Sequence, residues 1–131
     1  MSTPKKQVLC VEDDDATCEL LKFMLPDYEL TTVGSIAEAI SRVGSTRFDL
    51  YLLDRGLPDG SGLELCRMIR TSDSMTPIVF CSGAAALPDR MLVFEAGANA
   101  FLKKPEGWSQ LQHTLNRLLE NDLNEVKEAV V

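Results

Sequence analysis

Short apolar runs recur along the chain and are separated by longer amphipathic stretches. The four clearest runs do not alternate apolar with polar residues. Such continuous runs are typical of strands buried on both faces, as in a parallel sheet. They lie at residues 8–11, 50–53, 78–81 and 100–102, and a weaker run at 29–33 indicates an edge strand.

Helical periodicity fills the stretches between these runs. Residues that favour helix ends mark most of their boundaries, and the last helix shows an apolar stripe. In chain order the signals are Asp14 or Asp15 with Pro26, Ser35 with Gly44, Ser61, Pro88 with Gly97, and the stripe of Trp108, Leu111, Leu115, Leu118 and Leu119.

The strand–helix order repeats five times, which predicts an α/β fold with a doubly wound parallel sheet and helices on both faces. Each step between strands leaves room for a right-handed crossover helix. Five units are too few for an eight-stranded barrel. We expect one domain over residues 1–121, with residues 122–131 forming a C-terminal helix extension or the start of a linker.

Composition narrows the classes of function. The chain has 131 residues, and 20 acidic against 13 basic side chains give a net charge of −7, which argues against direct nucleic-acid binding. No apolar run approaches the roughly 20 residues of a membrane helix. Residues 1–6 lack the pattern of a signal peptide, so we expect a cytoplasmic protein.

Cysteine and histidine are both uninformative about catalysis. The four cysteines form no C-x-x-C pair, and we expect buried free thiols in a reducing compartment. The single histidine, His113, lies on the polar side of the last predicted helix. A surface side chain is the simpler interpretation, which argues against catalysis or zinc binding that depends on histidine.

Polar residues follow the apolar runs where the predicted strands end. Parallel strands end at one edge of the sheet, and ligands of such folds bind outside that edge. Each residue alone has a commonplace alternative, because an acid after a strand often only caps the next helix. The four runs together supply Glu12 and Asp13, Asp54, Ser82, and Lys103 with Lys104.

Carboxylates that converge repel one another unless a cation offsets their charge. Mg²⁺ prefers oxygen ligands and is often held by one or two carboxylates and a phosphate. A serine hydroxyl and a lysine ammonium at the same edge suit phosphoryl oxygens. The set therefore favours Asp54 as a nucleophile that forms an aspartyl-phosphate.

Three stretches around these residues resemble the receiver (phosphoacceptor) domain of two-component response regulators. They are Val8–Asp14 with its acidic pair, Asp49–Gly62 with Asp54 and the following loop, and Ala96–Pro105 with its Lys-Pro ending. The resemblance covers about residues 6–120. It implies a flavodoxin-like (βα)5 fold with strand order 2-1-3-4-5.

The resemblance also implies a role for each site residue. Asp54 would accept a phosphoryl group from a histidine kinase or a His-containing phosphotransfer protein. Ser82 and Lys104 would bind the phosphoryl oxygens, the Lys104–Pro105 bond would be cis, and the rotamer of Phe101 would report the switch. Mg²⁺ would be held by Glu12, Asp13, Asp54 and the main-chain carbonyl of Gly56.

The implied function is a phosphorylation-dependent switch, with no enzymatic activity beyond its own phosphorylation and dephosphorylation. The switch would act on an output partner or a missing effector domain through residues 91–95 and 101–112, and a phosphorylation-dependent homodimer is a further expectation. The alternative is a receiver-like interaction module that never takes phosphate. A phosphatase would want a general acid at position 56, which is glycine.

Overall fold

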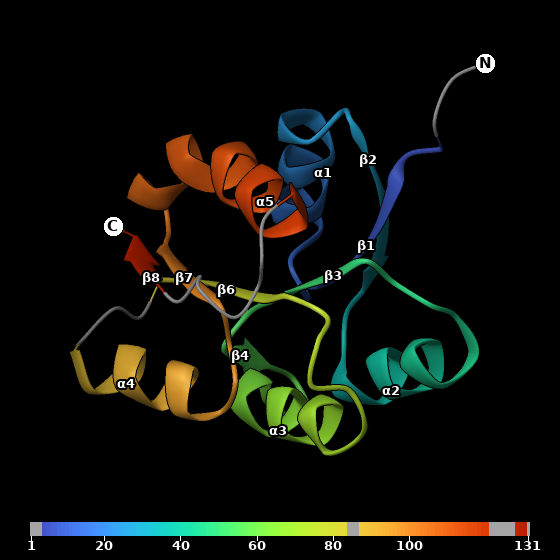
Figure 1. The fold of residues 1–131 in the computed structure, drawn as a ribbon, viewed down its shortest axis with the longest axis vertical. Coiled ribbons are helices and arrows are strands. Elements are labelled where there is room, and N and C mark those ends of the chain that lie inside the picture. Colours follow the sequence, from blue (N-terminus) through green and yellow to red (C-terminus); the bar gives the residue numbers. More distant parts are fainter. Residues whose placement is uncertain (1–3, 84–86, 121–127, 131) are drawn as a thin grey trace.

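The computed structural model describes residues 4–83, 87–120 and 128–130. A parallel sheet lies between two layers of helices (Figure 1). Its strands, in spatial order, are β2 (Tyr28–Val33), β1 (Lys6–Val11), β3 (Leu50–Leu53), β6 (Ile78–Ser82), β7 (Ala100–Lys103) and β8 (Glu128–Val130). The first five confirm the order 2-1-3-4-5.

The helices divide between the two faces of the sheet (Figure 1). One face is covered by α1 (Asp15–Met24) and α5 (Leu111–Glu120). The other face is covered by α2 (Ile36–Ser45), α3 (Gly62–Ser72) and α4 (Leu87–Glu95). This is the doubly wound arrangement that the sequence predicts.

Each central strand contributes to two separate apolar cores because successive side chains point to opposite faces. In β1, Leu9 and Val11 join the core beside α2 and α3, whereas Val8 and Cys10 join the core beside α1 and α5. All four side chains are at most 1% exposed. The continuous apolar runs are therefore explained by burial on both faces.

The capping residues behave as the sequence predicts. The side chain of Asp14 accepts a hydrogen bond from the main-chain N–H of Thr17, so Asp14 and not Asp15 is the N-cap of α1. Ser35 and Ser61 cap α2 and α3 in the same way. The helices that flank the sheet edge therefore begin at fixed positions.

Two local elements differ from the sequence expectation. A short hairpin of β4 (Gly56–Leu57) and β5 (Gly60–Ser61) follows β3, where a plain loop is expected. The last helix is preceded by a 3-10 turn, η1 (Glu106–Gln110), which holds Trp108. The stripe of Trp108 and the four leucines therefore runs across two elements.

The strand β8 is a further difference. Within the tail, where a helix extension or a linker is expected, residues 128–130 pair in parallel with β7, and residues 121–127 lie outside the described residues. The crossover from β7 through α5 to β8 is left-handed, because α5 covers the face opposite α2, α3 and α4 (Figure 1). Left-handed crossovers are rare in parallel sheets. The sequence pattern does not indicate β8 because three residues are too few to show a strand pattern.

Cysteine and histidine lie as the sequence predicts, since the four cysteines are free and buried and His113 is exposed. Among the described residues, no helix has the length and apolar character needed to cross a membrane.

Gly62 allows α3 to begin directly against the end of β3. A Cβ atom at this position would overlap the carbonyl oxygen of Asp54 and would lie 3.2 Å from the ring of Phe80. The main-chain N–H of Gly62 donates to the carbonyl of Arg55 at 2.7 Å, which draws the chain close. The position of Asp54 therefore depends on a glycine eight residues later.

Gly62→Ala is expected to lower the free energy of unfolding by about 1–3 kcal/mol, because the added methyl overpacks a backbone contact. Urea denaturation measures the change. The matched control is Gly44→Ala in α2, where a Cβ would meet nothing within 4 Å. We expect this control to be neutral or to gain about 0.5–1 kcal/mol. Equal behaviour of the two variants would contradict the close approach.

Candidate functional site

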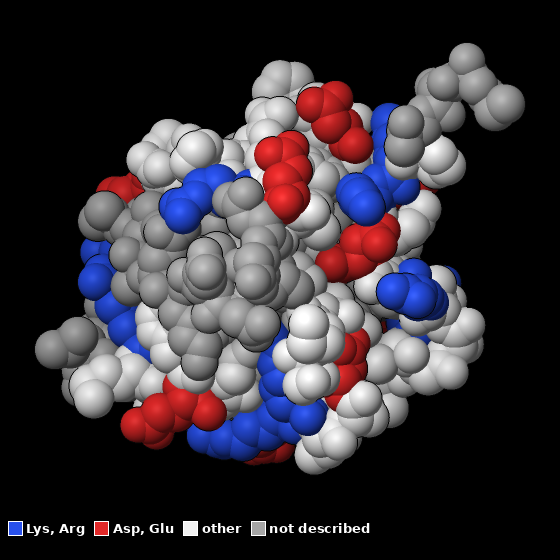
Figure 2. Space-filling view, viewed as in Figure 1, with Lys and Arg blue, Asp and Glu red and all other residues white. Residues whose placement is uncertain are grey.

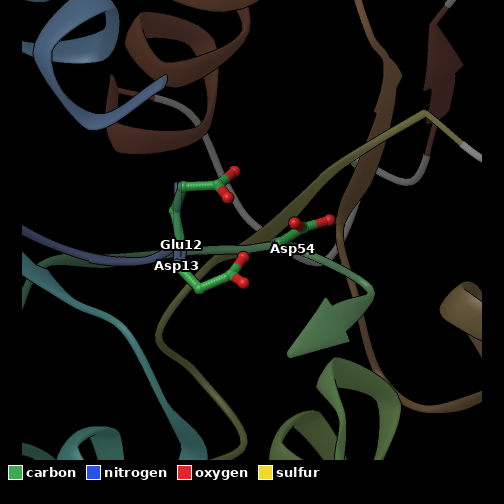
Figure 3. Close-up of side chains that lie close together, drawn as sticks. All are labelled: Glu12, Asp13 and Asp54. Carbon is green, nitrogen blue, oxygen red and sulfur yellow. The ribbon is translucent and has the colours of Figure 1, made fainter. Parts of the chain in front are cut away.

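Three carboxylates meet at the edge where the strands end. Glu12 and Asp13 follow β1, and Asp54 follows β3, the strand paired with β1. Each offers a carboxylate oxygen within 4.8 Å of the others (Figure 3). The register pairs Val11 with Leu53, so Glu12 and Asp54 continue neighbouring strands. The sheet therefore produces the cluster that the sequence predicts.

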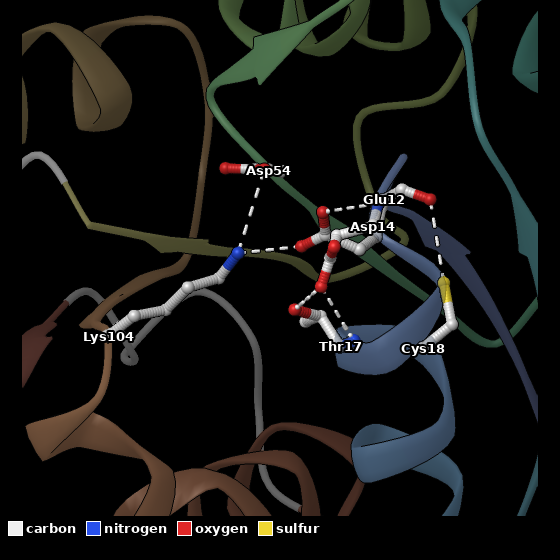
Figure 4. A network of polar contacts seen from close by, with 6 residues as sticks. All are labelled: Glu12, Asp14, Thr17, Cys18, Asp54 and Lys104. Atoms are coloured by element: carbon white, nitrogen blue, oxygen red, sulfur yellow. Dashed lines mark hydrogen bonds and ion pairs between the residues drawn. The ribbon is translucent and has the colours of Figure 1, made fainter.

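Lys104 brings a positive charge to the cluster (Figure 4). Its Nζ lies 2.6 Å from Oε1 of Glu12 and 3.6 Å from Oδ2 of Asp54. It follows β7, and the Lys104–Pro105 peptide bond is cis, as the resemblance implies. The neighbouring Lys103 lies instead 3.9 Å from Glu106.

Burial and charge act against each other in this group. Burial raises the pKa of Asp54 above its usual value, against the opposing effect of Lys104, and the charge of Glu12 adds to the rise. Burial lowers the pKa of Lys104, but its hydrogen bond to Glu12 and the charge of Asp54 outweigh burial, so that the pKa is raised overall. The ammonium is thus firmly charged, while ionised Asp54 is held unfavourably.

Glu12 is fixed through both of its carboxylate oxygens. Oε1 accepts from Lys104, and Oε2 accepts from the main-chain N–H of Asp14 at 3.1 Å (Figure 4). The side chain is only 5% exposed. Asp14 in turn accepts from both the main-chain N–H and the hydroxyl of Thr17, which lowers its pKa. The start of α1 therefore orients one wall of the cluster.

The donor set suits a hard divalent cation. Three carboxylates lie together with only one ammonium, that of Lys104, bound to two of them, and oxygen is the ligand type that Mg²⁺ prefers. Asp13 is exposed and Asp54 is partly exposed, so an ion could reach both. Gly56 is also exposed and lies two residues beyond Asp54, in β4.

The other predicted residues lie at the ends of β6 and in β7. Ser82 is the last residue of β6, which is the neighbour of β3, and it is 4% exposed. Its main-chain carbonyl accepts from the N–H of Lys104 at 2.9 Å. Phe101 is fully buried in the core beside α3 and α4, on the opposite face of the sheet from Trp108. The roles of Ser82 and Phe101 stay predictions.

Trp108 is a member of the site that the sequence pattern assigns only to the apolar stripe. Its ring centroid lies 6.0 Å from Nζ of Lys104, and both residues line a small cleft with Glu12 and Asp54. The only signal in the sequence is its place soon after Lys104–Pro105. The single tryptophan of the chain therefore lies beside the charged group.

Comparison with known proteins agrees with this arrangement. The sequence profile of the response regulator receiver domain matches residues 8–116. The chain belongs to the response regulator receiver domain family. The match includes both acids after β1, Asp54, Ser82 and Lys104, so the geometry and the family point to the same edge of this receiver domain.

Relatives and solved structures extend the comparison. The DNA-binding response regulator MtrA of Mycolicibacterium smegmatis is 34% identical over 107 residues, which cover 80% of this receiver domain's chain and 46% of MtrA. The chain thus spans about half the length of the curated relatives it matches. The non-phosphorylated HemR receiver domain of Leptospira biflexa is 33% identical with a TM-score of 0.82, covering 90% of this chain and 97% of that one.

A third similar structure bears on the metal. The receiver domain of the sensor histidine kinase PA1611 of Pseudomonas aeruginosa carries a magnesium ion coordinated in its active-site cleft. It is 29% identical, has a TM-score of 0.81, and covers 90% of this chain and 100% of that one.

Asp54→Asn is expected to raise stability at neutral pH when divalent cations are absent. The raised pKa means that folding favours protonated Asp54. Its contribution is therefore present below the usual aspartate pKa of about 3.9 and is lost as pH rises through the raised value. Thermal denaturation of the parent and of Asp54→Asn at several pH values from about 3 to about 8 measures the difference in stability between them. This difference should shrink toward low pH.

Asp14→Asn is the control of opposite sign. The pKa of Asp14 is lowered, so its ionised form favours folding, and this contribution is present above the usual pKa and lost as pH falls through the lowered one. If Asp54→Asn proved less stable than the parent at neutral pH, the electrostatic description of the cluster would be wrong.

Proposed function

We propose that Asp54 accepts a phosphoryl group in the presence of Mg²⁺ and that this switches the domain between two conformations. The observation that carries the proposal is the convergence of Asp54 with two further carboxylates and Lys104 at one sheet edge. Glu12, Asp13, Asp54 and the main-chain carbonyl of Gly56 would hold the ion.

The chemistry follows from these positions. An oxygen of Asp54 forms a bond to phosphorus while the bond from phosphorus to the donor's leaving group breaks, and the leaving group keeps that electron pair. Mg²⁺ supplies neutralisation of the negative charge on the phosphoryl oxygens. Such a transfer needs mainly positioning and charge stabilisation from the protein, which Lys104 and Ser82 would provide.

The switch would begin at Lys104. Its Nζ lies 2.6 Å from Glu12 but 3.6 Å from Asp54, so a phosphoryl group on Asp54 would place new anionic oxygens near an ammonium engaged elsewhere. A conformer in which Lys104 and Ser82 bind those oxygens better gains population. Since both residues adjoin β6 and β7, the change would reach α4, β7 and α5, with Phe101 between them.

The partners belong to the proposal. We propose a histidine kinase or a His-containing phosphotransfer protein as the phosphoryl donor. An output partner or an effector domain would respond to the switch, and a phosphorylation-dependent homodimer is one form of that output. The free cysteines suit a reducing, cytoplasmic location. We do not propose for this domain the DNA binding that is named for MtrA, of which the match covers 46%.

The charge distribution argues against direct nucleic-acid binding by this domain. The net charge is −7, and on the face shown in Figure 2 the acidic and basic side chains of the described residues are interspersed rather than gathered into one basic surface. Direct nucleic-acid binding by this domain would need a basic footprint.

Phosphorylation by a small donor tests the proposal. The protein is incubated with Mg²⁺ and acetyl phosphate beside Asp54→Asn, and intact masses are recorded. We expect the parent alone to gain one phosphoryl group, and a chelator to abolish the gain. The matched control Asp49→Asn changes a carboxylate before β3 that accepts from Gln7, so it should be phosphorylated like the parent.

A second donor decides a negative result. If neither acetyl phosphate nor a phosphorylated histidine kinase modifies the parent, the phosphoacceptor function is wrong and the interaction module takes its place. A phosphoryl group of equal occupancy on the Asp54→Asn variant would place the acceptor elsewhere.

A further inference from the structure

The hairpin after Asp54 is tied to a helix that begins much earlier in the chain. Asp59 lies in the turn between β4 and β5. Its Oδ1 accepts from the main-chain N–H of Ile36 at 2.8 Å, and its Oδ2 accepts from that of Ala37 at 3.1 Å. These hydrogen bonds lower the pKa of Asp59. The first N–H groups of a helix lack acceptors within the helix, so the carboxylate completes the start of α2.

The turn that leads from β2 into α2 lies against the acidic pair. The main-chain N–H of Glu12 donates to the carbonyl of Val33 at 2.9 Å. At Gly34, a Cβ would lie 3.8 Å from Cα of Asp13. The turn from β2 into α2 thus supports one wall of the carboxylate cluster. Asp59 joins that turn to the hairpin, which forms the other wall.

Gly56 depends on the hairpin for its position. It is exposed, and a Cβ on it would meet nothing within 4 Å, so side-chain packing does not hold it. The hairpin pairs Gly56 with Ser61 and Leu57 with Gly60. Gly60 has a φ of +151°, and its Cβ would lie 2.8 Å from Cδ1 of Ile36, so the tip is seated closely on α2.

We propose that Asp59 is a positioning residue for the cation. By clasping the start of α2, its carboxylate fixes the distance between the main-chain carbonyl of Gly56 and the acidic pair, and this sets the affinity of the site for Mg²⁺. The inference rests on the proposed function, because that function supplies the ion and the role of Gly56. Outer groups that orient metal ligands commonly affect affinity by about ten- to a hundredfold.

Titration of the metal-free protein with Mg²⁺ tests the positioning role of Asp59 without any phosphoryl transfer. Calorimetry gives the affinity, and the fluorescence of Trp108, which lies beside Lys104, gives a second readout. Asp59→Ala is expected to bind Mg²⁺ about tenfold more weakly than the parent. Asp59→Asn should fall between them, because its amide oxygen can still accept one of the two N–H groups.

Asp73→Ala is the matched control. Asp73 also accepts from two main-chain N–H groups, those of Met75 and Thr76, both at 3.0 Å, but it lies before β6 at the opposite end of the sheet. Both alanine variants should lower the thermal midpoint, while only Asp59→Ala should change Mg²⁺ affinity. Hydrogen exchange of the Ile36 and Ala37 amides should accelerate only in Asp59→Ala.

The outcomes separate the two proposals. If the parent binds Mg²⁺ and both Asp59 variants bind it with the same affinity, the positioning role of Asp59 is wrong and the proposed function is unaffected. If the parent does not bind Mg²⁺, both the Mg²⁺ requirement of the proposed function and the positioning role of Asp59 are wrong. Equal weakening in Asp73→Ala would show a general loss of stability and would also overturn the positioning role.

Discussion

The ion pair between Lys104 and Glu12 is the interaction on which the site depends. It joins the ends of β7 and β1, which are three strand spacings apart, or about 14 Å at about 4.8 Å each. Both side chains must extend across β3 and β6 to meet. Asp54 follows β3, and its Oδ2 lies 3.6 Å from the ammonium nitrogen, so its carboxylate and any group attached to it fall within the field of the ammonium.

The positive charge of Lys104 is outnumbered by the carboxylates of the cluster. The ammonium of Lys104 pairs with two of the three clustered carboxylates, those of Glu12 and Asp54, and burial already opposes ionised Asp54. Added negative charge at Asp54 therefore changes the balance that holds Lys104 on Glu12, whereas added positive charge relieves the repulsion. Lys104 is half-buried and pairs with Glu12 and Asp54. Because it directly follows β7, a change in its pairing reaches that strand.

Rigidity around the cluster comes from groups that only hold the backbone. Gly62 lets α3 begin against Asp54, Asp14 orients Glu12, and Asp59 joins the two walls. None of these groups is the long side chain of Lys104, which reaches the cluster from β7. Under the proposed switch, this held backbone would keep the carboxylates in place while Lys104 changes its partner.

The sequence predicts much of this because the responsible signals are local. Apolar runs place the strands, caps place the helices, and parallel strands must end together, so Glu12, Asp13, Asp54 and Lys104 are expected to meet. The role of Asp59 is missed, since its partners Ile36 and Ala37 lie more than twenty residues earlier in the chain and follow no period. The place of Trp108 beside Lys104 is missed because the apolar stripe already explains a tryptophan at that position. The hairpin and β8 are missed because their strands, of two and three residues, are too short to show a pattern.

The stability of the metal-free and Mg²⁺-bound protein tests the central claim, that repulsion among the carboxylates is relieved by a cation, most directly. Urea denaturation over a range of Mg²⁺ concentrations would be recorded for the parent and Asp13→Asn. We predict that the parent gains stability with the logarithm of Mg²⁺ concentration, as binding to the folded state alone requires, and that Asp13→Asn gains much less. A parent whose stability is independent of Mg²⁺ would contradict the account.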